Sequence, residues 1–564
     1  MIYKYIIMCG IWQLFLNPIN KSDINRYYKM CNKVSKRGPD MSNIINLNYG
    51  IIGFHRLAIN GLTEDGMQPF NYETERYKYI LVCNGEIYNH KDLEELCDYK
   101  NESKSDCEVL LPLLANYCNN NMELFFNMIN GEFAMIITII DKNTNIKHIY
   151  LSTDPMSVRP LFYQNINNKE NSGLLVSSIL NGMSRDNQSY RLKQAEIRYY
   201  IYDDNNINFI NSNIYHKYEN PEEDVIIEEN IELYQLIVNT FFKTVEKRLM
   251  TDRPLCCLLS GGLDSSLVAS VAQRIKKEKY PDKSLNTFTI GMEGGSDLEY
   301  AKQVADYIGS NHQEINFTPD IGLNVIDEVI KTCESYDITT IRASVGQYLL
   351  GKYISENTEY KVLLNGDGAD EIEMGYLYFY LAPNESEAQL ESIKLIKNIC
   401  MFDGLRADRN ISNFGLEARF PHEDKEFLDL YLKIDPKLKI PTKNRMEKYL
   451  IRKAFDEIFK DNPILPNEIL WRKKEAFSDG VSNKEKSWYQ MTQEYGKKMV
   501  SDEELIILQE KYKDYIMPTT NESAYYRKKF DEYFGYNAEK CIPYFWLPNW
   551  SNEIDPSARE LKVY

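Results

Sequence analysis

Short apolar runs separated by turn residues dominate the chain from residue 9 to about residue 210. Four of these runs have the length and composition of β-strands, at residues 79–83, 133–140, 148–152 and 174–177. A few helical stretches, such as residues 108–118, lie between them. This pattern is typical of an α+β domain with antiparallel sheets.

The pattern changes at Ile231. Helical periodicity over 231–249 precedes a strand at 255–259, and helices then separate this strand from two more, at 287–290 and 361–364. Strands that alternate with helices predict a parallel, doubly wound α/β sheet, and the chain from about 390 to 535 is mainly helical in character. The polar, acidic stretch before Ile231 indicates a linker. The predicted division is 9–215, 216–230 and 231–564.

The amino-acid composition argues against several classes of protein and binding site. The 564 residues are 43% hydrophobic and 26% charged, and the net charge of −17 argues against a general nucleic-acid binder. The chain has no apolar run of 18 residues, so we expect no membrane span, and residues 1–8 are too short for a signal peptide. Eleven cysteines without Cys-x-x-Cys pairs predict neither a disulfide framework nor a zinc site. A cytoplasmic location follows as an expectation.

Residues 260–266 read Ser-Gly-Gly-Leu-Asp-Ser-Ser, between a strand pattern and a helix pattern. Glycines and a helix start offer backbone N–H groups to an anion, and Asp264 adds a carboxylate that suits Mg²⁺ between oxyanions. The run lacks the lysine of the common phosphate loop. It resembles the pyrophosphate loop of ATP-pyrophosphatases, which split ATP into AMP and pyrophosphate. A plain turn of small residues is the alternative.

A second set of motifs opens the chain. Cys9-Gly-Ile-Trp12 is followed by Arg37-Gly-Pro-Asp40, by residues 54–59 (FHRLAI), by residues 84–89 (NGEIYN) and by residues 105–108 (SDCE). Each is weak alone, since a cysteine near a terminus is usually structural. In this order they resemble the glutaminase domain of class II amidotransferases. That resemblance implies the fold of N-terminal nucleophile hydrolases, with layered antiparallel sheets and helices.

The resemblance implies a role for each residue of this site. Cys9 would be the nucleophile, with its own α-amine as base, and the Asn84 side chain and the Gly85 N–H would form the oxyanion hole. Arg56 would bind the glutamine α-carboxylate, while Glu86 and Asp106 would hold its α-ammonium and backbone polar groups. The pocket would be lined by Leu57, Ala58, Ile59 and Asn60. Because a nucleophile that uses its own amine must be N-terminal, we expect translation to start at Met8 or the leader to be removed.

Both halves together resemble the glutamine-hydrolysing asparagine synthetases, over residues 9–564. The resemblance implies that L-aspartate is activated by ATP as β-aspartyl-AMP and that ammonia from glutamine discharges it, giving asparagine, glutamate, AMP and pyrophosphate. The expected partners are therefore L-glutamine, L-aspartate and ATP, with Mg²⁺, and a homodimer stays open. Three alternatives remain: an ammonia-dependent synthetase with a silent glutaminase, an amidotransferase for another carboxylate, and a non-catalytic interaction protein.

The resemblance also assigns residues of the second half. Thr339 and Arg342, in the segment 334–344, fall on positions linked to aspartate. Asp264 and Asp370 fall on Mg²⁺-linked positions, and Lys448 falls on a lysine that neutralises ATP phosphates. The expected ATP contacts are Leu258, Ser260, Gly261, Gly262, Asp264, Ser265, Ile290, Asn365 and Gly366.

Three stretches depart from the family wording. Asp367 stands where the family has the glutamate assigned to adenylate formation or to deprotonating ammonia, which shortens its reach by roughly 1.5 Å. Residues 421–424 (PHED) replace Pro-Phe-Leu-Asp, and Glu373-Met374 replaces Phe-Gly. The last two departures have no function that the sequence reveals.

Overall fold

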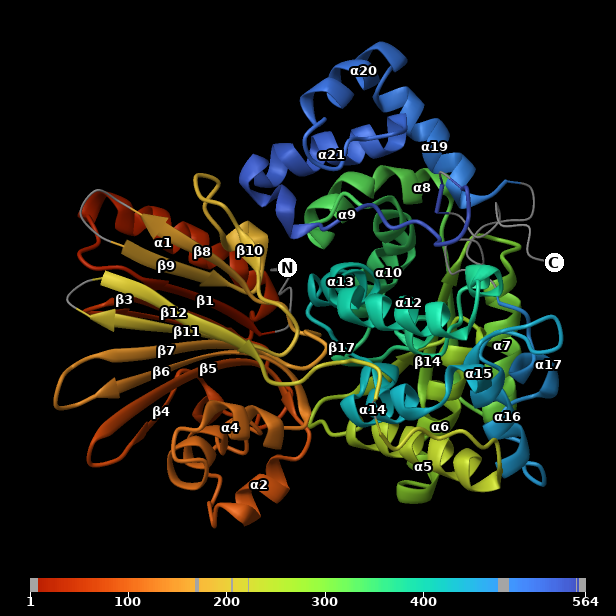
Figure 1. Cartoon of the computed structure of the whole chain (residues 1–564), viewed down its shortest axis with the longest axis horizontal. Helices are drawn as coiled ribbons and strands as arrows, with labels where there is room; N and C mark the ends of the chain where they lie inside the picture. Colours follow the sequence, from red (N-terminus) through yellow and green to blue (C-terminus); the bar gives the residue numbers. More distant parts are fainter. Residues whose placement is uncertain are drawn as a thin grey trace.

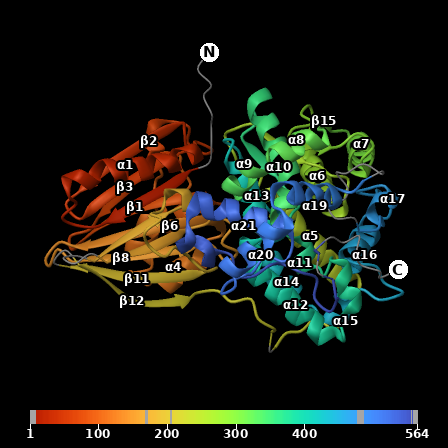
Figure 2. The ribbon, with the colours of Figure 1, turned by 90° about the horizontal axis from the view of Figure 1, so that it is seen from above.

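The computed structural model describes residues 9–167, 172–203, 206–221, 223–474, 486–553 and 555–556. Two lobes lie side by side, an N-terminal one built on strands and a C-terminal one rich in helices (Figures 1 and 2). The leader, residues 1–8, lies outside the described residues, as do residues 168–171, 204–205, 222, 475–485, 554 and 557–564.

Two six-stranded antiparallel sheets face each other in the N-terminal lobe. The first has the order β10-β8-β9-β1-β3-β2 and the second β12-β11-β7-β6-β5-β4. The first sheet consists of β1 (Gly10–Phe15), β2 (Met41–Leu47), β3 (Gly50–Arg56), β8 (Phe162–Asn167), β9 (Ser172–Ser177) and β10 (Tyr190–Arg191). The second consists of β4 (Phe70–Glu73), β5 (Tyr77–Ile87), β6 (Gly131–Asp141), β7 (Lys147–Thr153), β11 (Glu196–Asp203) and β12 (Asn206–Ile214). All four predicted strands lie within these sheets.

Helices cover both outer faces of this sandwich (Figure 1). The helix α1 (Lys21–Val34) packs on the first sheet. On the second sheet lie α2 (His90–Leu96), α3 (Leu110–Pro112) and α4 (Met122–Met128). The helix expected at 108–118 is present only in part, because α3 passes into a π-helical turn at Leu113–Tyr117. Apolar side chains fill the space between the sheets, so β1 is buried on both faces.

A five-stranded parallel sheet with the order β15-β14-β13-β16-β17 forms the centre of the C-terminal lobe. The strands are β13 (Leu255–Leu258), β14 (Asn286–Gly291), β15 (Asn311–Asn316), β16 (Val362–Leu364) and β17 (Glu417–Arg419). The first, second and fourth of these correspond to the predicted strands. The other two were not predicted: β15 is mostly polar, and β17 is only three residues long inside a region expected to be helical.

Helices lie on both faces of this sheet, with α10 and α13 on one side and α5, α6 and α7 on the other (Figure 1). Helices α19, α20 and α21 form the top of the lobe. The bounds are α5 (Ile231–Lys247), α6 (Leu263–Lys279), α7 (Ser296–Ile308), α8 (Pro319–Asn324), α9 (Ile326–Cys333), α10 (Ile338–Asn357), α11 (Ala369–Ile372), α12 (Glu385–Asn398), α13 (Asp403–Ser412), α14 (Lys425–Lys433), α15 (Pro436–Lys439), α16 (Tyr449–Ile458), α17 (Asn467–Leu470), α19 (Trp488–Met499), α20 (Asp502–Lys511) and α21 (Asn521–Phe534). Within the described ranges, none of these helices has the length and apolar character needed to cross a lipid bilayer.

The carboxyl ends of β13 and β16 lie next to each other, because Cys257 pairs with Leu364. The loop after β13 carries residues 259–262, and the loop after β16 carries residues 365–368. In open parallel sheets, ligands bind in the crevice outside these strand ends. The fold therefore brings the two small-residue loops of the sequence to one edge.

Candidate active sites

Cys9 directly precedes β1 and is held by the backbone of Leu57. The N–H of Leu57 donates to the sulfur at 3.3 Å, and the thiol donates to the Leu57 carbonyl at 3.4 Å. Burial raises the pKa of the Cys9 thiol to about 12. A thiol in this environment needs a base beside it before it can act as a nucleophile.

Asn84 lies on β5 of the second sheet, and β5 contacts β1 of the first sheet. Its side chain is 1% exposed, and its Nδ2 finds no hydrogen-bond partner among the described residues. The next residue, Gly85, has no room for a side chain, since a Cβ would lie 2.2 Å from the carbonyl oxygen of Glu132. A buried amide donor with no partner matches what an oxyanion hole requires.

The predicted glutamine residues gather around one loop. Arg56 donates to the carbonyls of Asn60, Gly61 and Thr63, which keeps its guanidinium over the segment 57–63. Asn60 in turn donates to the carboxyl of Glu86. The structure thus brings these three predicted residues together.

Glu86 and Asp106 are both buried, at 4% exposed. Burial raises the pKa of each carboxyl above its ordinary value, and the neighbouring Glu417 raises the pKa of Glu86 further. Asp106 accepts a hydrogen bond of 2.6 Å from the backbone of Ile87, and Glu86 lies 3.2 Å from Arg419 of the other lobe. Two buried carboxyls offer an acceptor site for an ammonium group.

The loop 57–61 also contacts the C-terminal lobe. The N–H of Gly61 donates to Asp252 at 2.9 Å, and Arg253 donates to the carbonyl of Ala58 at 2.8 Å. Ile59 packs with Val362 of β16 in a small apolar cluster that also contacts Cys9. The residues predicted to bind glutamine therefore reach the amino end of β16.

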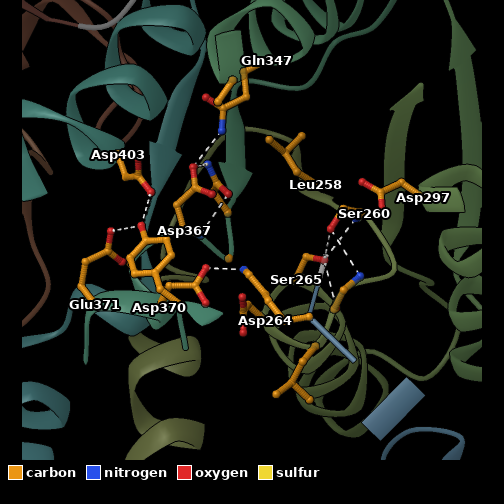
Figure 3. A pocket seen from close by; sticks show the side chains of 18 of the residues that line it. Leu258, Ser260, Asp264, Ser265, Asp297, Gln347, Asp367, Asp370, Glu371 and Asp403 are labelled. Atoms are coloured by element: carbon orange, nitrogen blue, oxygen red, sulfur yellow. Dashed lines mark hydrogen bonds and ion pairs between the residues drawn. The ribbon is translucent and has the colours of Figure 1, made fainter. Parts of the chain in front are cut away.

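One large pocket opens at the carboxyl edge of the parallel sheet (Figure 3). Most predicted residues of the C-terminal half line it: Leu258, Ser260, Gly262, Asp264, Ser265, Ile290, Thr339, Asn365, Gly366, Asp367, Asp370 and Lys448. Gly261 and Arg342 are the two predicted residues that are outside this lining.

The two loops of the pocket fit closely. Gly261 has a φ of +75°, and a Cβ there would lie 2.4 Å from the backbone of Ala301. A Cβ on Gly366 would lie 2.6 Å from the backbone nitrogen of Ser265. Since α6 begins at Leu263, Asp264 and Ser265 occupy its first turn, where free N–H groups favour an anion.

Lys448 bridges the two carboxylates that were expected to bind metal. Its Nζ lies 2.6 Å from Asp264 and 2.6 Å from Asp370, and Lys474 also contacts Asp370. Burial opposes the charge on Asp370, but Lys448 and Lys474 outweigh it and hold its pKa below the ordinary value. In the same way Asp264 and Asp370 raise the pKa of Lys448 despite burial. The three groups form one charged centre at this end of the pocket.

Asp367 lies beside Asp370, on the side of the pocket toward Gln347 (Figure 3). Its Oδ2 accepts hydrogen bonds from Gln347 at 2.8 Å and from Asn365 at 3.1 Å, and its Oδ1 lies 3.6 Å from Arg406. Burial raises the pKa of Asp367, against the lowering effect of Arg406.

Arg342 is placed differently from the sequence expectation. It is 4% exposed, and its guanidinium forms paired contacts with Glu522 and with Asp555, at 2.7 to 2.9 Å. Two carboxylates therefore saturate its donors behind the pocket wall. Among the residues that line the pocket, the guanidinium beside Asp367 belongs to Arg406 instead.

Sequence reasoning missed three polar groups of this wall. Arg406 is 7% exposed and its Nε has no partner within the described part of the chain, as is also true of Gln347 Oε1 and of the predicted Thr339 Oγ1. The Tyr376 hydroxyl lies within hydrogen-bond distance of both Glu371, at 2.7 Å, and Asp403, at 2.9 Å. Arg406 lies on α13, and its place in the pocket wall depends on the packing of α13 against α10.

Comparison with known proteins gives matches along nearly the whole chain. The family model described as "Asparagine synthase" matches residues 237–399 and 382–552, and the one described as "Glutamine amidotransferase domain" matches 8–221. The chain is 37% identical to the glutamine-hydrolysing asparagine synthetase of Cricetulus griseus and 38% identical to that of Homo sapiens, covering 99% of both chains in each case.

A solved structure also matches at low similarity. A glutamine phosphoribosylpyrophosphate amidotransferase from B. subtilis matches 54% of this chain and 81% of its own, with 14% identity and a TM-score of 0.29.

Proposed function

This chain belongs to the family of glutamine-hydrolysing asparagine synthetases, and we propose below how its residues divide the work. The enzyme converts L-aspartate to L-asparagine with ATP and takes the amide nitrogen from glutamine. The observation that carries the residue assignment is the single pocket at the sheet edge, which joins the loops 258–265 and 365–370 to Lys448.

Glutamine hydrolysis begins at Cys9. Its sulfur attacks the side-chain amide carbon, and the proton of the thiol passes to a base. Because burial raises the pKa of this thiol to about 12, the base must be adjacent, and the α-amine of Cys9 itself meets that need. The unpartnered Nδ2 of Asn84 and the N–H of Gly85 stabilise the oxyanion that forms.

Glutamine is oriented by the charged groups around the loop 57–63. Arg56 binds the α-carboxylate in place of the loop carbonyls that it contacts here. The α-ammonium lies between the carboxyls of Glu86 and Asp106, whose raised pKa values fall when a positive charge arrives. Leu57, Ala58, Ile59 and Asn60 complete this pocket.

Ammonia then travels along β16 of the parallel sheet. Val362 shares an apolar cluster with Cys9, Leu57 and Ile59, while Asp367 lies five residues further along the chain in the second pocket. Asp367 is in the turn after β16, so these five residues span at most about 17 Å. An apolar entrance favours neutral ammonia over ammonium and keeps water away.

ATP binds in the pocket with its phosphates at the α6 N-terminus. Ser260, Gly261, Gly262 and Ser265 offer donors to the phosphates, and Leu258, Ile290, Asn365 and Gly366 contact the nucleoside part.

Lys448 lies at the phosphate end of this pocket. It neutralises the charge that develops there when aspartate attacks the α-phosphorus and pyrophosphate leaves.

The residues at this end also fit Mg²⁺. Asp264 and Asp370 converge on one point, now neutralised by Lys448, although the described residues contain no cluster of three or more His, Cys, Asp or Glu side chains. Mg²⁺ commonly uses one or two protein carboxylates and completes its shell with substrate phosphates and water. When bound, the ion would supply charge neutralisation of the pyrophosphate leaving group.

Aspartate binds near Asp367, on the side of the pocket toward Gln347. Thr339 Oγ1 and Arg406 Nε are buried donors with no hydrogen-bond partner in the described ranges, and we assign them to the substrate carboxylates. Arg342 supports this wall from behind, through Glu522 and Asp555. Asp367 then takes a proton from the attacking ammonia.

The decisive test is AMP formation that depends on both glutamine and aspartate. We expect the wild type to form AMP and asparagine with glutamine or with ammonium salts. Cys9→Ala should keep the ammonia-driven reaction and lose the glutamine-driven one. A wild type that uses ammonium alone would favour the synthetase with a silent glutaminase, and activation of another carboxylate in its place would overturn the assignment of aspartate.

The base assignment has its own test. The α-amine of Cys9 must be free in the active enzyme, so N-terminal sequencing of purified, glutamine-active protein should begin at Cys9. An intact MIYKYIIM leader on such protein would refute this mechanism.

Further assignments extend this proposal. We assign 9–215 to glutamine hydrolysis, 216–230 to the linker and 231–564 to asparagine formation, supported by the end of β12 at Ile214 and the start of α5 at Ile231. A cytoplasmic location is supported by eleven free cysteines. Light scattering on the purified protein would distinguish a monomer from a homodimer.

A further inference from the structure

A buried acid–base pair lies behind the phosphate end of the pocket, in residues that the mechanism above does not use. The Oε1 atom of Glu373 lies 3.2 Å from Nδ1 of His422, and the two residues are 2% and 0% exposed. Glu373 caps the carboxyl end of α11, whereas His422 lies in a short 3₁₀ turn, Pro421–Glu423. These are two of the positions at which the sequence departs from the family wording.

The surroundings of this pair are aromatic. The ring of His422 packs against Phe241 and Phe427, with centroids 4.9 and 6.1 Å away. Burial raises the pKa of Glu373, and the neighbouring His422 and Lys448 lower it again. Apolar residues of similar size would stabilise such a site equally well or better. Stability alone therefore does not explain why the pair is there.

The geometry of α11 connects the pair to Lys448. Asp370 lies in the first turn of α11 and Glu373 caps its carboxyl end, so the two are about one helical turn apart. The turn that follows packs against the lysine stem, because a Cβ on Gly375 would lie 2.1 Å from Lys448 Cε and 2.2 Å from Asp370 Oδ1. Glu373 thus belongs to the same electrostatic group as Asp264, Asp370 and Lys448.

We propose that Glu373, seated by His422, is a positioning residue for Lys448. In the free enzyme the lysine is held by Asp264 and Asp370 at its head. When ATP binds, the Lys448 ammonium must turn from these carboxylates toward the phosphates. Glu373 is the third carboxyl of the group; it does not move with the ammonium, and its charge keeps the lysine side chain oriented. This inference rests on the proposed phosphate-binding role of Lys448.

Three variants test the proposal: Glu373→Gln, His422→Phe and the combination of both. We expect each single change to lower aspartate-dependent ATP–pyrophosphate exchange about tenfold in kcat, because displacing a catalytic group by a fraction of an ångström has effects of this order. The KM for aspartate and the glutaminase rate should stay unchanged. The double variant should be no worse than either single one, and His422→Gln, which keeps a polar side chain beside Glu373, should recover most of the rate.

Glu539→Gln is the matched control. It breaks another buried pair, Arg527–Glu539, whose residues do not line the pocket. This variant should lower the Tm but leave the exchange rate unchanged. If Glu373→Gln and His422→Phe behave like Glu539→Gln, with exchange within about twofold of wild type, the pair is only structural and the proposal is wrong.

A binding measurement separates this inference from the proposed function. Calorimetry should show that Glu373→Gln weakens binding of ATP but not of adenosine, since only ATP reaches Lys448. Absence of exchange in the wild type would refute the proposed function. In that case, comparing the ratio of ATP affinity to adenosine affinity between Glu373→Gln and the wild type still tests the positioning role by itself. If Glu373→Gln does not fold, His422→Phe provides the same comparison.

Discussion

Lengthening Asp367 by one methylene tests how firmly its carboxylate is seated. Gln347 and Asn365 both donate to Oδ2, at 2.8 and 3.1 Å, while Arg406 lies 3.6 Å from Oδ1. The donors come from α10 and from the loop after β16, so they cannot follow a longer side chain together. Asp367→Glu restores the residue type of the family wording, yet the structure predicts that it harms this enzyme.

The size of the effect follows from these distances. An added methylene moves the carboxylate by about 1.5 Å, which carries Oδ2 out of hydrogen-bond range of at least one donor. A hydrogen bond to a charged group contributes about 1.5–3 kcal/mol. A misplacement of about 1 Å at a reacting group lowers the rate about 10²-fold, or about 2.7 kcal/mol, so the two estimates agree.

Aspartate-dependent ATP–pyrophosphate exchange and asparagine formation from ammonium salts are the assays. Both should fall about 10²-fold in Asp367→Glu, and glutamine hydrolysis without ATP should be unchanged. Asp367→Asn keeps the reach and removes the charge, so it measures the charge alone. Asp367→Glu activity within about threefold of wild type would show that the loop reseats a longer residue and would refute the reasoning.

Three further changes have definite expected outcomes. Asn84→Ala should lower glutamine-driven synthesis about 10²–10³-fold and leave ammonia-driven synthesis intact; an equal loss of both would exclude the oxyanion role. Burial lowers the pKa of Lys439 from 10.5 to about 7, so between these values the unfolded chain holds a proton that the folded one lacks. The free energy of unfolding of the enzyme therefore rises with pH over this range, by up to about 1.4 kcal/mol per pH unit. Lys439→Met should remove this slope in urea titrations at pH 7–9. Arg342→Ala leaves Glu522 and Asp555 buried without their cation and should destabilise the enzyme by about 3–5 kcal/mol, which a wild-type Tm would contradict.

The place of the loop 260–266 in the fold could be predicted from the local sequence. The loop 260–266 needs its glycines and hydroxyls wherever it lies, so its place at the sheet edge followed from the strand and helix patterns around it. The role of Arg342 could not be read in this way. An arginine in a polar helix start suits a substrate carboxylate and a buried protein carboxylate equally well, and only the tertiary packing of α21 brings Glu522 to it.

The strands that escaped prediction show the same limit. β17 has only three residues, one of which is Arg419, and periodicity cannot distinguish so short a run from a loop. Arg419 is buried because it pairs with Glu417 of the same strand and with Glu86 of the other lobe. Burial of this kind is decided by contacts between lobes, which no local pattern contains.

Arg37 makes one of these contacts between the lobes, next to Cys9. Its motif was assigned to the glutaminase half, yet its guanidinium crosses to Asp408 on α13, at 3.0 Å, while its Nε donates to the carbonyl of Cys9. Arg159 also contacts Asp408, at 3.3 Å. Because residues two apart on a helix point in different directions, α13 presents Asp408 to the glutaminase lobe and Arg406 to the synthetase pocket. The helix α13 is therefore connected both to the backbone of Cys9, through Arg37, and to the wall of the pocket, through Arg406.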